Sequence, residues 1–145
     1  MRIYLDNCCY NRPYDDQSQT LISLETQAKI EIQQKIKDNE ILLSSSFIQR
    51  YENSQNPYDM RRDSIVSFID ENTSDYVSAE RRKEVQAISR EIMKTGVKMK
   101  DSYHVACAII EKCDYFLTTD KRLLKYHDER IRICNPIDFI RETEE

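Results

Sequence analysis

Four acidic residues that are far apart in the sequence, Asp6, Glu52, Asp101 and Asp120, have the chemistry to form one metal site. Carboxylate oxygens and water are the ligands that Mg²⁺ and Mn²⁺ prefer. Without a cation the cluster is unfavourable, because two unit charges about 4 Å apart repel by about 1 kcal/mol in water and more near a protein surface. A bound divalent cation can activate a water and neutralise the charge of a phosphodiester. These residues therefore suit metal-dependent phosphodiester hydrolysis if the fold brings them together.

Two of the four acids directly follow segments that read as short apolar strands. Arg2–Leu5 ends at Asp6, and Asp114–Thr119 ends at Asp120. In an open parallel sheet, ligands bind beyond the carboxyl ends of the strands. We therefore expect both aspartates at this edge of the sheet.

The other two acids are expected near the same edge, on helices. Glu40–Ser44 reads as a strand, and Ser45 or Ser46 can cap the next helix, which places Glu52 about two turns along it. Asp101 lies in the first turn of another helix, and a helix that feeds a parallel strand begins at the edge where the ligands bind. Topology alone thus predicts that the four carboxylates meet.

The rest of the chain reads as helices with a few strands. The remaining expected elements are a helix from Ser18, a helix around Ile65, Phe68 and Ile69, an extended segment Asp75–Ser78, a helix over Glu80–Thr95, a helix from Asp120 through Lys125, a strand over Ile131–Cys134 and a short helix after Pro136. The Ser18 helix has an apolar stripe at spacings of three and four, namely Leu21, Leu24, Ala28, Ile32 and Ile36. Tyr103–Ile110 is apolar nearly all round, which marks a buried helix.

Strands that alternate with helices predict an α/β fold, a three-layer α/β/α arrangement with a central parallel sheet. The single glycine, Gly96, argues against a sheet built from tight hairpins, and it follows a helix where a left-handed residue is wanted. The length of 145 residues suits one domain over 1–145.

Composition narrows the class of protein. The net charge of −4 argues against a protein that coats nucleic acid, and the basic runs Arg61-Arg62 and Arg81-Arg82-Lys83 read as solvated helix faces. The five cysteines, without a Cys-x-x-Cys pair, read as reduced thiols in the core. No apolar run approaches the ~20 residues of a membrane span, and the charged start does not suit a signal peptide. We expect a cytoplasmic protein with no membrane partner.

The sequence resembles the PIN-domain family in blocks that run through nearly the whole chain. Ile3–Asp6 is similar to the family's opening strand and first acid, and Gly96–Ala106 resembles its third-acid block. Asp114–Leu124 resembles its strand-then-acid block and is the most specific match. Ser46 stands six positions before Glu52, which is similar to the family's Ser-to-Glu spacing.

This resemblance implies a PIN-like three-layer fold, a Mg²⁺ or Mn²⁺ site, and cleavage of single-stranded RNA. Asp6, Glu52, Asp101 and Asp120 are then both the catalytic and the metal-binding residues. Many bacterial members are VapC-like toxins that an antitoxin holds inactive, so the implied partners are RNA and a small antitoxin; a homodimer is left open. Departures from the pattern are Ser102 in place of alanine and the run Asn7–Pro13 after the first acid.

Several residues carry two interpretations. Asn7 and Arg12, just past the first strand, and Lys121, beside Asp120, are candidate substrate contacts, with loop structure or a solvated surface as the alternative. His104 and Cys107 are three apart on one helix, and core packing is favoured over a reactive pair. His104 also lies one turn from Asp101 and could face the acidic site, but core packing is favoured for it as well.

Other functions remain open at this point. Each acid taken alone suits an ordinary role, such as a helix cap, a turn residue or an exposed helix side chain. A receiver-like phosphoacceptor domain also gathers acids at a sheet edge, but serines end the second strand here. A non-catalytic PIN-fold binding module and a metal-dependent DNA nuclease are the alternatives to a ribonuclease.

Overall fold

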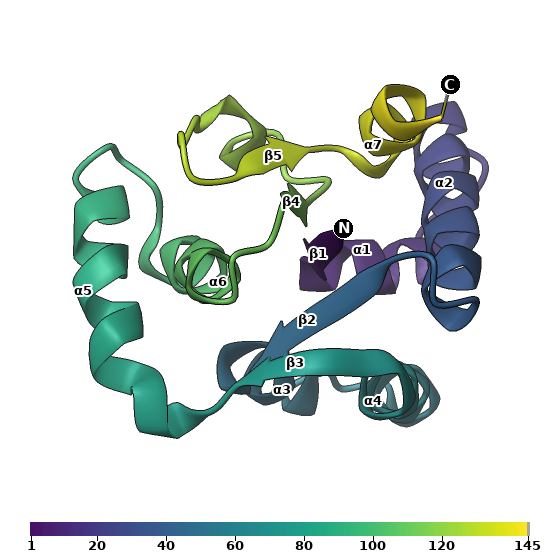
Figure 1. Ribbon diagram of the computed structural model, residues 1–145. Coiled ribbons are helices and arrows are strands. Elements are labelled where there is room, and N and C mark those ends of the chain that lie inside the picture. The colour runs from purple at the N-terminus through teal and green to yellow at the C-terminus, as the bar shows by residue number, and fades with distance from the viewer. Residues whose placement is uncertain (145) are drawn as a thin grey trace.

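A computed structural model describes residues 1–144 and contains a five-stranded parallel sheet (Figure 1). The strands are β1 (Arg2–Leu5), β2 (Leu42–Ser46), β3 (Thr73–Val77), β4 (Tyr115–Leu117) and β5 (Arg132–Cys134). Their order is β3-β2-β1-β4-β5, and every neighbouring pair is parallel. The central strand β1 therefore lies between β2 and β4, so the three strands expected to lead to Asp6, Glu52 and Asp120 are direct neighbours.

Helices cover both faces of this sheet. The helices are α1 (Asn7–Asn11), α2 (Thr20–Lys37), α3 (Phe47–Ser54), α4 (Asp59–Asn72), α5 (Arg82–Met93), α6 (Met99–Ile110) and α7 (Pro136–Thr143). In Figure 1, α2 and α7 lie on one side of the sheet and α5 and α6 on the other. The expected three-layer α/β/α fold with a central parallel sheet is confirmed.

The alternation of side chains along the strands divides the core into two parts. Ile3 and Leu5 on β1 pack with Ile32 of α2 and Phe139 of α7. Tyr4, between them, belongs to the other core, with the buried residues of α5 and α6. Successive strand residues point to opposite faces, so both alternating sets of side chains are buried in a parallel sheet that helices cover on both sides.

The expected stripe of α2 is partly wrong. Leu21 and Leu24 are 49% and 47% exposed, whereas Glu25 and Lys29 are buried. Glu25 is tolerated inside because Arg12 pairs with it at 2.8 Å. Burial lowers the pKa of Lys29 to about 8.

Some helix and strand boundaries also differ from the expected ones. Gln19, not Ser18, precedes α2, and its side chain forms no capping hydrogen bond. After Asp120 the chain forms only a short 3-10 helix, Leu123–Lys125, instead of a regular helix. Ser46, which ends β2, does cap the next helix as expected, because its hydroxyl accepts a hydrogen bond from Gln49 N at 3.1 Å.

Other expectations are confirmed. Gly96 has a φ of +101°, the left-handed region that favours glycine. The cysteines are free thiols, and Cys8 is the one that is not fully buried. Within residues 1–144, no helix combines the length and the apolar character that crossing a membrane requires.

Candidate functional site

Asp6 lies at the carboxyl end of β1 and is held in place from both sides. Its backbone N–H donates to Leu117 O at 2.9 Å, across the β1–β4 pair. Its side chain caps α1 by accepting from Asn7 N at 2.8 Å, and it also accepts from the Thr118 hydroxyl at 2.9 Å. Asp6 is only 6% exposed. A carboxylate fixed in this way is preorganised to bind a ligand at the strand ends.

Glu52 projects from α3 toward α6, where two cationic or hydrogen-bonding groups meet it. One oxygen pairs with Lys100 Nζ at 2.6 Å, and the other contacts His104 Nε2 at 2.8 Å. Burial by itself would raise the pKa of Glu52, but His104 and Lys100 together outweigh it and lower the pKa. Glu52 is therefore kept ionised in a partly buried place.

His104 connects Glu52 to a buried chain of hydrogen bonds. Its Nδ1 contacts the Tyr4 hydroxyl at 2.8 Å, and that hydroxyl contacts the Ser46 hydroxyl at 2.7 Å. His104 is buried, as expected, yet it also faces the acidic cluster, which the sequence left open. Ser46 links this chain to α3 because the same hydroxyl caps that helix. The orientation of Glu52 thus depends on residues from β1, β2 and α6.

Asp120 and Asp101 lie on the β4 side of Asp6. The Thr118 hydroxyl that donates to Asp6 also accepts from Asp120 N at 3.1 Å, so it joins the two acids. One Asp120 oxygen caps the turn that follows, accepting from Arg122 N at 2.8 Å. Oδ1 of Asp120 therefore has the ordinary capping role that was the alternative to metal binding.

Asp101, in the first turn of α6, shares the electrostatic environment of the other acids. Partial burial raises its pKa most, and the negative charges of Asp6, Asp120 and Glu52 raise it further. Asp101 and Asp120 also line one cavity of about 670 Å³. The charges of three carboxylates thus act on Asp101. Among the described site residues, a direct hydrogen bond joins Glu52 to His104, whereas Asp101 interacts with the other acids through charge.

The donor set fits a divalent cation. Asp6, Glu52 and His104 each offer one donor atom, and these atoms lie within 4.8 Å of one another. Across residues 1–144, no lysine or arginine forms an ion pair with Asp6, Asp101 or Asp120, and Lys100 is the cation that pairs with Glu52. Carboxylates with one imidazole suit Mn²⁺, and the carboxylates alone suit Mg²⁺. The sequence favoured core packing for His104 over a place at the site; the structure places it in both, buried and within this group of donor atoms.

The candidate substrate contacts have different surroundings. Asn7 is buried beside Asp6, and its side-chain oxygen has no hydrogen-bond partner among the described residues. Arg12 pairs with Asp15 at 3.0 Å and with Glu25 at 2.8 Å, which supports its structural interpretation. Lys121 is exposed.

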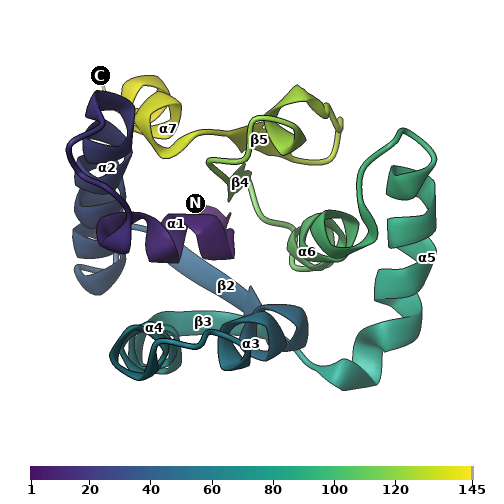
Figure 2. The same ribbon diagram turned by 180° about the vertical axis from the view of Figure 1, so that it is seen from behind.

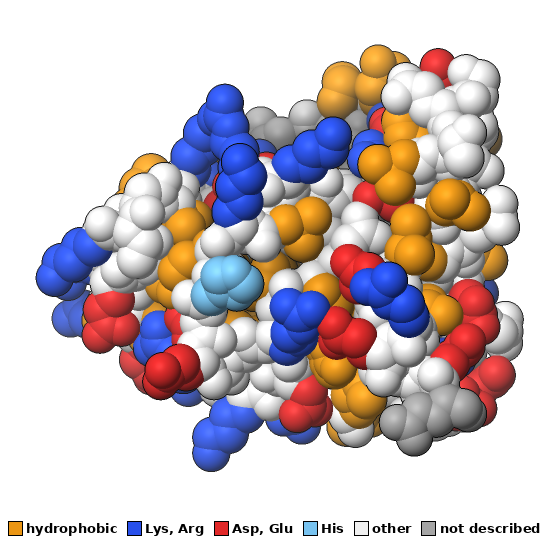
Figure 3. Space-filling view, turned by 90° about the horizontal axis from the view of Figure 1, so that it is seen from above, with side chains coloured by type: hydrophobic (Ala, Val, Ile, Leu, Met, Phe, Trp, Pro, Cys, Tyr) orange, Lys and Arg blue, Asp and Glu red, His pale blue; other side chains and the backbone are white. Residues whose placement is uncertain are grey.

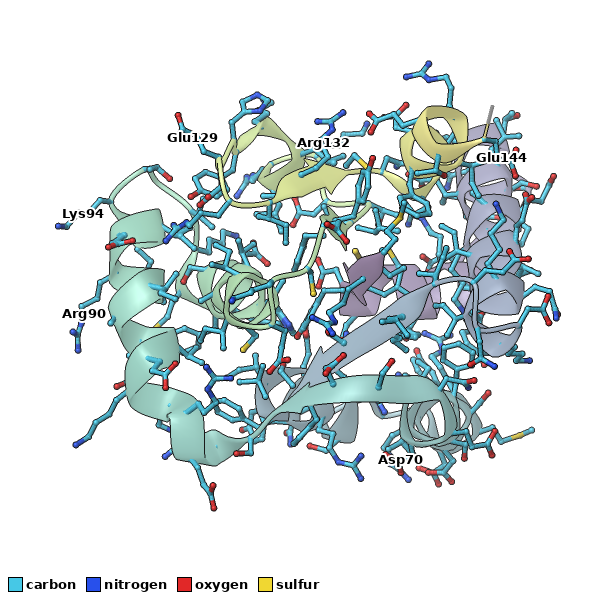
Figure 4. The ribbon with its side chains drawn as sticks, in the orientation of Figure 1. Asp70, Arg90, Lys94, Glu129, Arg132 and Glu144 are labelled. Carbon is cyan, nitrogen blue, oxygen red and sulfur yellow. The ribbon has the colours of Figure 1, made fainter. Side chains whose placement is uncertain are left out.

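Charged side chains on the outer surface are interspersed in sign. Figure 3 shows lysine and arginine among aspartate and glutamate on the face seen from above. Labelled residues such as Arg90 on α5, Lys94 directly after α5 and Asp70 on α4 point away from the sheet (Figure 4). Asp70 pairs with Arg50, and Arg81 pairs with Glu84, so many surface charges are locally compensated.

The fold and the acids at its strand ends define a PIN-like α/β/α class. Solved structures with this fold include VapBC2 from Rickettsia felis bound to a DNA fragment from its promoter, with a TM-score of 0.60 and 14% identity over 93% of this chain and 98% of that one. The structure of FitAB bound to the IR36 DNA fragment has a TM-score of 0.58 and 16% sequence identity, and the match covers 93% of this chain and 95% of that one. The structure of FitAcB from Neisseria gonorrhoeae has a TM-score of 0.54 and 15% sequence identity, and the match covers 92% of this chain and 97% of that one.

At such identities the likeness to these structures shows the fold alone. No family model matches the sequence, and no curated protein matches it significantly. The PIN-like fold is therefore shown by structure, while the activity has to be argued from the site.

Proposed function

We propose that this protein is a divalent-metal-dependent endoribonuclease that cleaves single-stranded RNA. The observation that carries the proposal is the buried Asp6 carboxylate, which lacks a cationic partner among residues 1–144 and has a donor atom within 4.8 Å of donor atoms of Glu52 and His104. A structural carboxylate buried this far normally has a countercharge. In this proposal a divalent cation held by Asp6 and its neighbours would supply it.

In this proposal Asp6, Glu52, Asp101 and Asp120 are the catalytic and metal-binding residues. They would hold Mg²⁺ or Mn²⁺, which would supply an activated water and neutralise charge on the phosphodiester. Asp6 offers a fixed carboxylate because α1 and Thr118 hold it. Glu52 stays ionised through His104 and Lys100.

We further propose a toxin role, with a small antitoxin as the partner. Support comes from the resemblance of the sequence to the PIN-domain family, which implies such a partner, and from the fold that the chain shares with the structures of VapBC2 and FitAB. A cytoplasmic location, a single PIN-like domain over 1–145 and a homodimer remain parts of the proposal. Asn7 and Lys121 remain candidate contacts for the RNA backbone.

The substrate assignment predicts a selective cleavage pattern. Purified protein in millimolar Mn²⁺ should cut a labelled single-stranded RNA and leave duplex DNA intact, and chelator should stop the reaction. Equal cutting of DNA and RNA would point to a general nuclease instead, and binding without any cutting would point to a non-catalytic module. Expression should slow growth unless a partner is co-expressed, and harmless expression of active enzyme would remove only the toxin part.

Lys100 yields a separate prediction about the metal. Its ammonium lies 2.6 Å from Glu52 Oε1 but is 64% exposed, so it competes for that oxygen and can swing away. Lys100→Met should therefore raise Mn²⁺ affinity about fivefold, roughly 1 kcal/mol, as expected for a solvent-screened charge. The measurement is a titration of free Mn²⁺ by electron paramagnetic resonance.

The matched control for that titration is Lys94→Met, because Lys94 points outward from α5 (Figure 4). Its Mn²⁺ affinity should equal that of the native protein. Weaker binding by Lys100→Met would mean that Lys100 orients Glu52 for the metal rather than competing with it.

A further inference from the structure

The surface beside Glu52 contains an apolar hollow of about 720 Å³, which we call the aromatic groove. It is bordered by α1, α3 and α6, which Figure 2 shows around the centre of the molecule. Its walls include Tyr51, Tyr58 and Tyr103, and Glu52 and Lys100 lie at its edge. Tyr51 and Tyr58 are 69% and 59% exposed, so two large aromatic side chains face solvent here. The volume falls in the usual range for small-ligand sites, roughly 300–1,000 Å³.

Three residues that line the groove each carry a buried hydrogen-bonding atom that has no partner among the described residues. These atoms are Asn7 Oδ1, Asn53 Oδ1 and Arg61 Nε. The Arg61 guanidinium is stacked between Tyr58 and Tyr14, with ring centroids at 4.4 and 4.7 Å. Unpaired polar groups cost free energy, so small rotations that pair them with a ligand would be favourable.

A second hollow lies on the other side of Lys100. Asp101 and Asp120 line this cavity of about 670 Å³, together with the basic residues Lys98, Arg122 and Lys125, and Lys100 lines both hollows. The cations suit phosphates, whereas the aromatic groove suits a flat apolar group with polar edges. The two hollows thus share Lys100 and each is lined by acids of the cluster, Asp101 and Asp120 in one and Glu52 in the other.

We propose that the aromatic groove binds one unstacked base of single-stranded RNA, next to the phosphate that the acidic cluster acts on. The inference rests on the proposed ribonuclease function and adds a base-binding subsite to it. Tyr58 and Tyr103 supply stacking surfaces, and Asn53 and Arg61 supply hydrogen bonds to the edge of the base. Single-stranded nucleic acids are commonly held through stacking on aromatic side chains together with cations along the backbone.

An RNA base fits these features better than a segment of a partner protein does. The groove adjoins Glu52 and Lys100 directly, so a strand whose phosphate lies at the acids has a base within reach of the groove. Its cations, Lys100 and Arg61, outnumber its single carboxylate, which favours a polyanion. A protein segment remains the alternative outcome of the test.

The test compares a short single-stranded RNA with the same strand in which the bases are removed. Binding is followed by fluorescence anisotropy in Mg²⁺, with all proteins carrying Asp101→Asn to prevent cleavage. Tyr58→Ala and Tyr103→Ala should each weaken binding of the normal strand about tenfold, within the range of base stacking. Neither should change binding of the abasic strand, and Tyr58→Phe and Tyr103→Phe should restore the affinity.

Tyr76→Ala is the control, because Tyr76 is a 44% exposed tyrosine on β3 outside the groove. Equal losses of affinity for the normal and the abasic strand would overturn the proposed base site. No loss of affinity for either strand would also overturn it, and would favour a segment of a partner protein as the occupant of the groove. Cleavage by the protein with native Asp101 in Mn²⁺ is measured separately. If the protein cleaves RNA but the tyrosine variants bind the normal and abasic strands alike, only the proposed base site is wrong. If the variants lose affinity for the normal strand alone but the native protein does not cleave RNA, only the proposed nuclease activity is wrong.

Discussion

Asp6→Asn, Asp101→Asn and Asp120→Asn will each lower metal-dependent RNA cleavage by about 100-fold or more. Each change removes one charged ligand from a shared site, and losing a group that merely supports a ligand already costs about 10- to 100-fold. Glu52→Gln should have the same effect or a slightly smaller one. The measurement is the single-turnover cleavage rate of a labelled RNA in Mn²⁺, with thermal melts to verify folding.

Asp114→Asn is the matched control for Asp120→Asn. Both aspartates flank β4, but Asp114 precedes the strand and lies at the opposite edge of the sheet. Its substitution should leave the cleavage rate unchanged, even though its carboxylate accepts a hydrogen bond from Arg2 N. If two of the three site aspartates can be neutralised with activity intact, the site is misplaced.

The fold was largely predictable because its signals are local. Short apolar strands separated by helices, with almost no glycine, leave a parallel sheet as the natural arrangement, and that sheet places Asp6 and Asp120 at one edge. The burial of α6 followed from its apolar sequence. These inferences needed only periodicity and chain direction.

The details of the site depend on side-chain contacts between distant segments, which the sequence does not specify. The chain from Glu52 through His104 and Tyr4 to Ser46 joins four different elements. The ion pair of Glu52 with Lys100 likewise depends on how α3 and α6 pack. Here the positions of the acids were predictable and their partners were not.

The stripe of α2 failed for a related reason. Apolar spacing placed Leu21 and Leu24 inside, yet Glu25 takes that position because Arg12, from the loop before α2, neutralises it. A local pattern cannot reveal a countercharge supplied by another segment. The same limit applies to the helix expected after Asp120, where the chain forms a short turn capped by that residue.

The second large effect concerns stability without metal. Partial burial and the charges of Asp6, Asp120 and Glu52 raise the pKa of Asp101 above that of an unfolded aspartate. The folded protein therefore holds this proton to higher pH than the unfolded chain does. The destabilising contribution appears as pH rises from the unfolded pKa through the folded one, and it is complete above both. Glu52 has a lowered pKa and behaves oppositely, stabilising the fold above its unfolded pKa and losing that contribution in acid.

Asp101→Asn removes the destabilising contribution of Asp101 and leaves the Glu52 carboxylate in place. The difference in melting temperature between the variant and the native protein therefore reports on Asp101. In chelator at neutral pH, the variant should melt above the native protein by up to roughly 2–4 °C, the shift that about 1 kcal/mol causes in a chain of this length; solvent screening of this half-exposed carboxylate makes about 1 kcal/mol the upper end. The difference should shrink as pH falls to about 4, near the ordinary pKa of an aspartate. Glu40→Gln, an exposed acid before β2, should show no such pH-dependent difference.

Adding metal should reverse the order of the melting temperatures of the native protein and Asp101→Asn. Mg²⁺ or Mn²⁺ at about 100 times its dissociation constant adds about 2.7 kcal/mol to the stability of the native protein by mass action. Asp101→Asn binds the ion more weakly and should gain much less, so the native protein should melt higher in metal and lower in chelator. Thermal melts of both proteins under both conditions decide the matter. If the variant melts below the native protein in chelator and metal shifts both equally, the four carboxylates do not share a metal site.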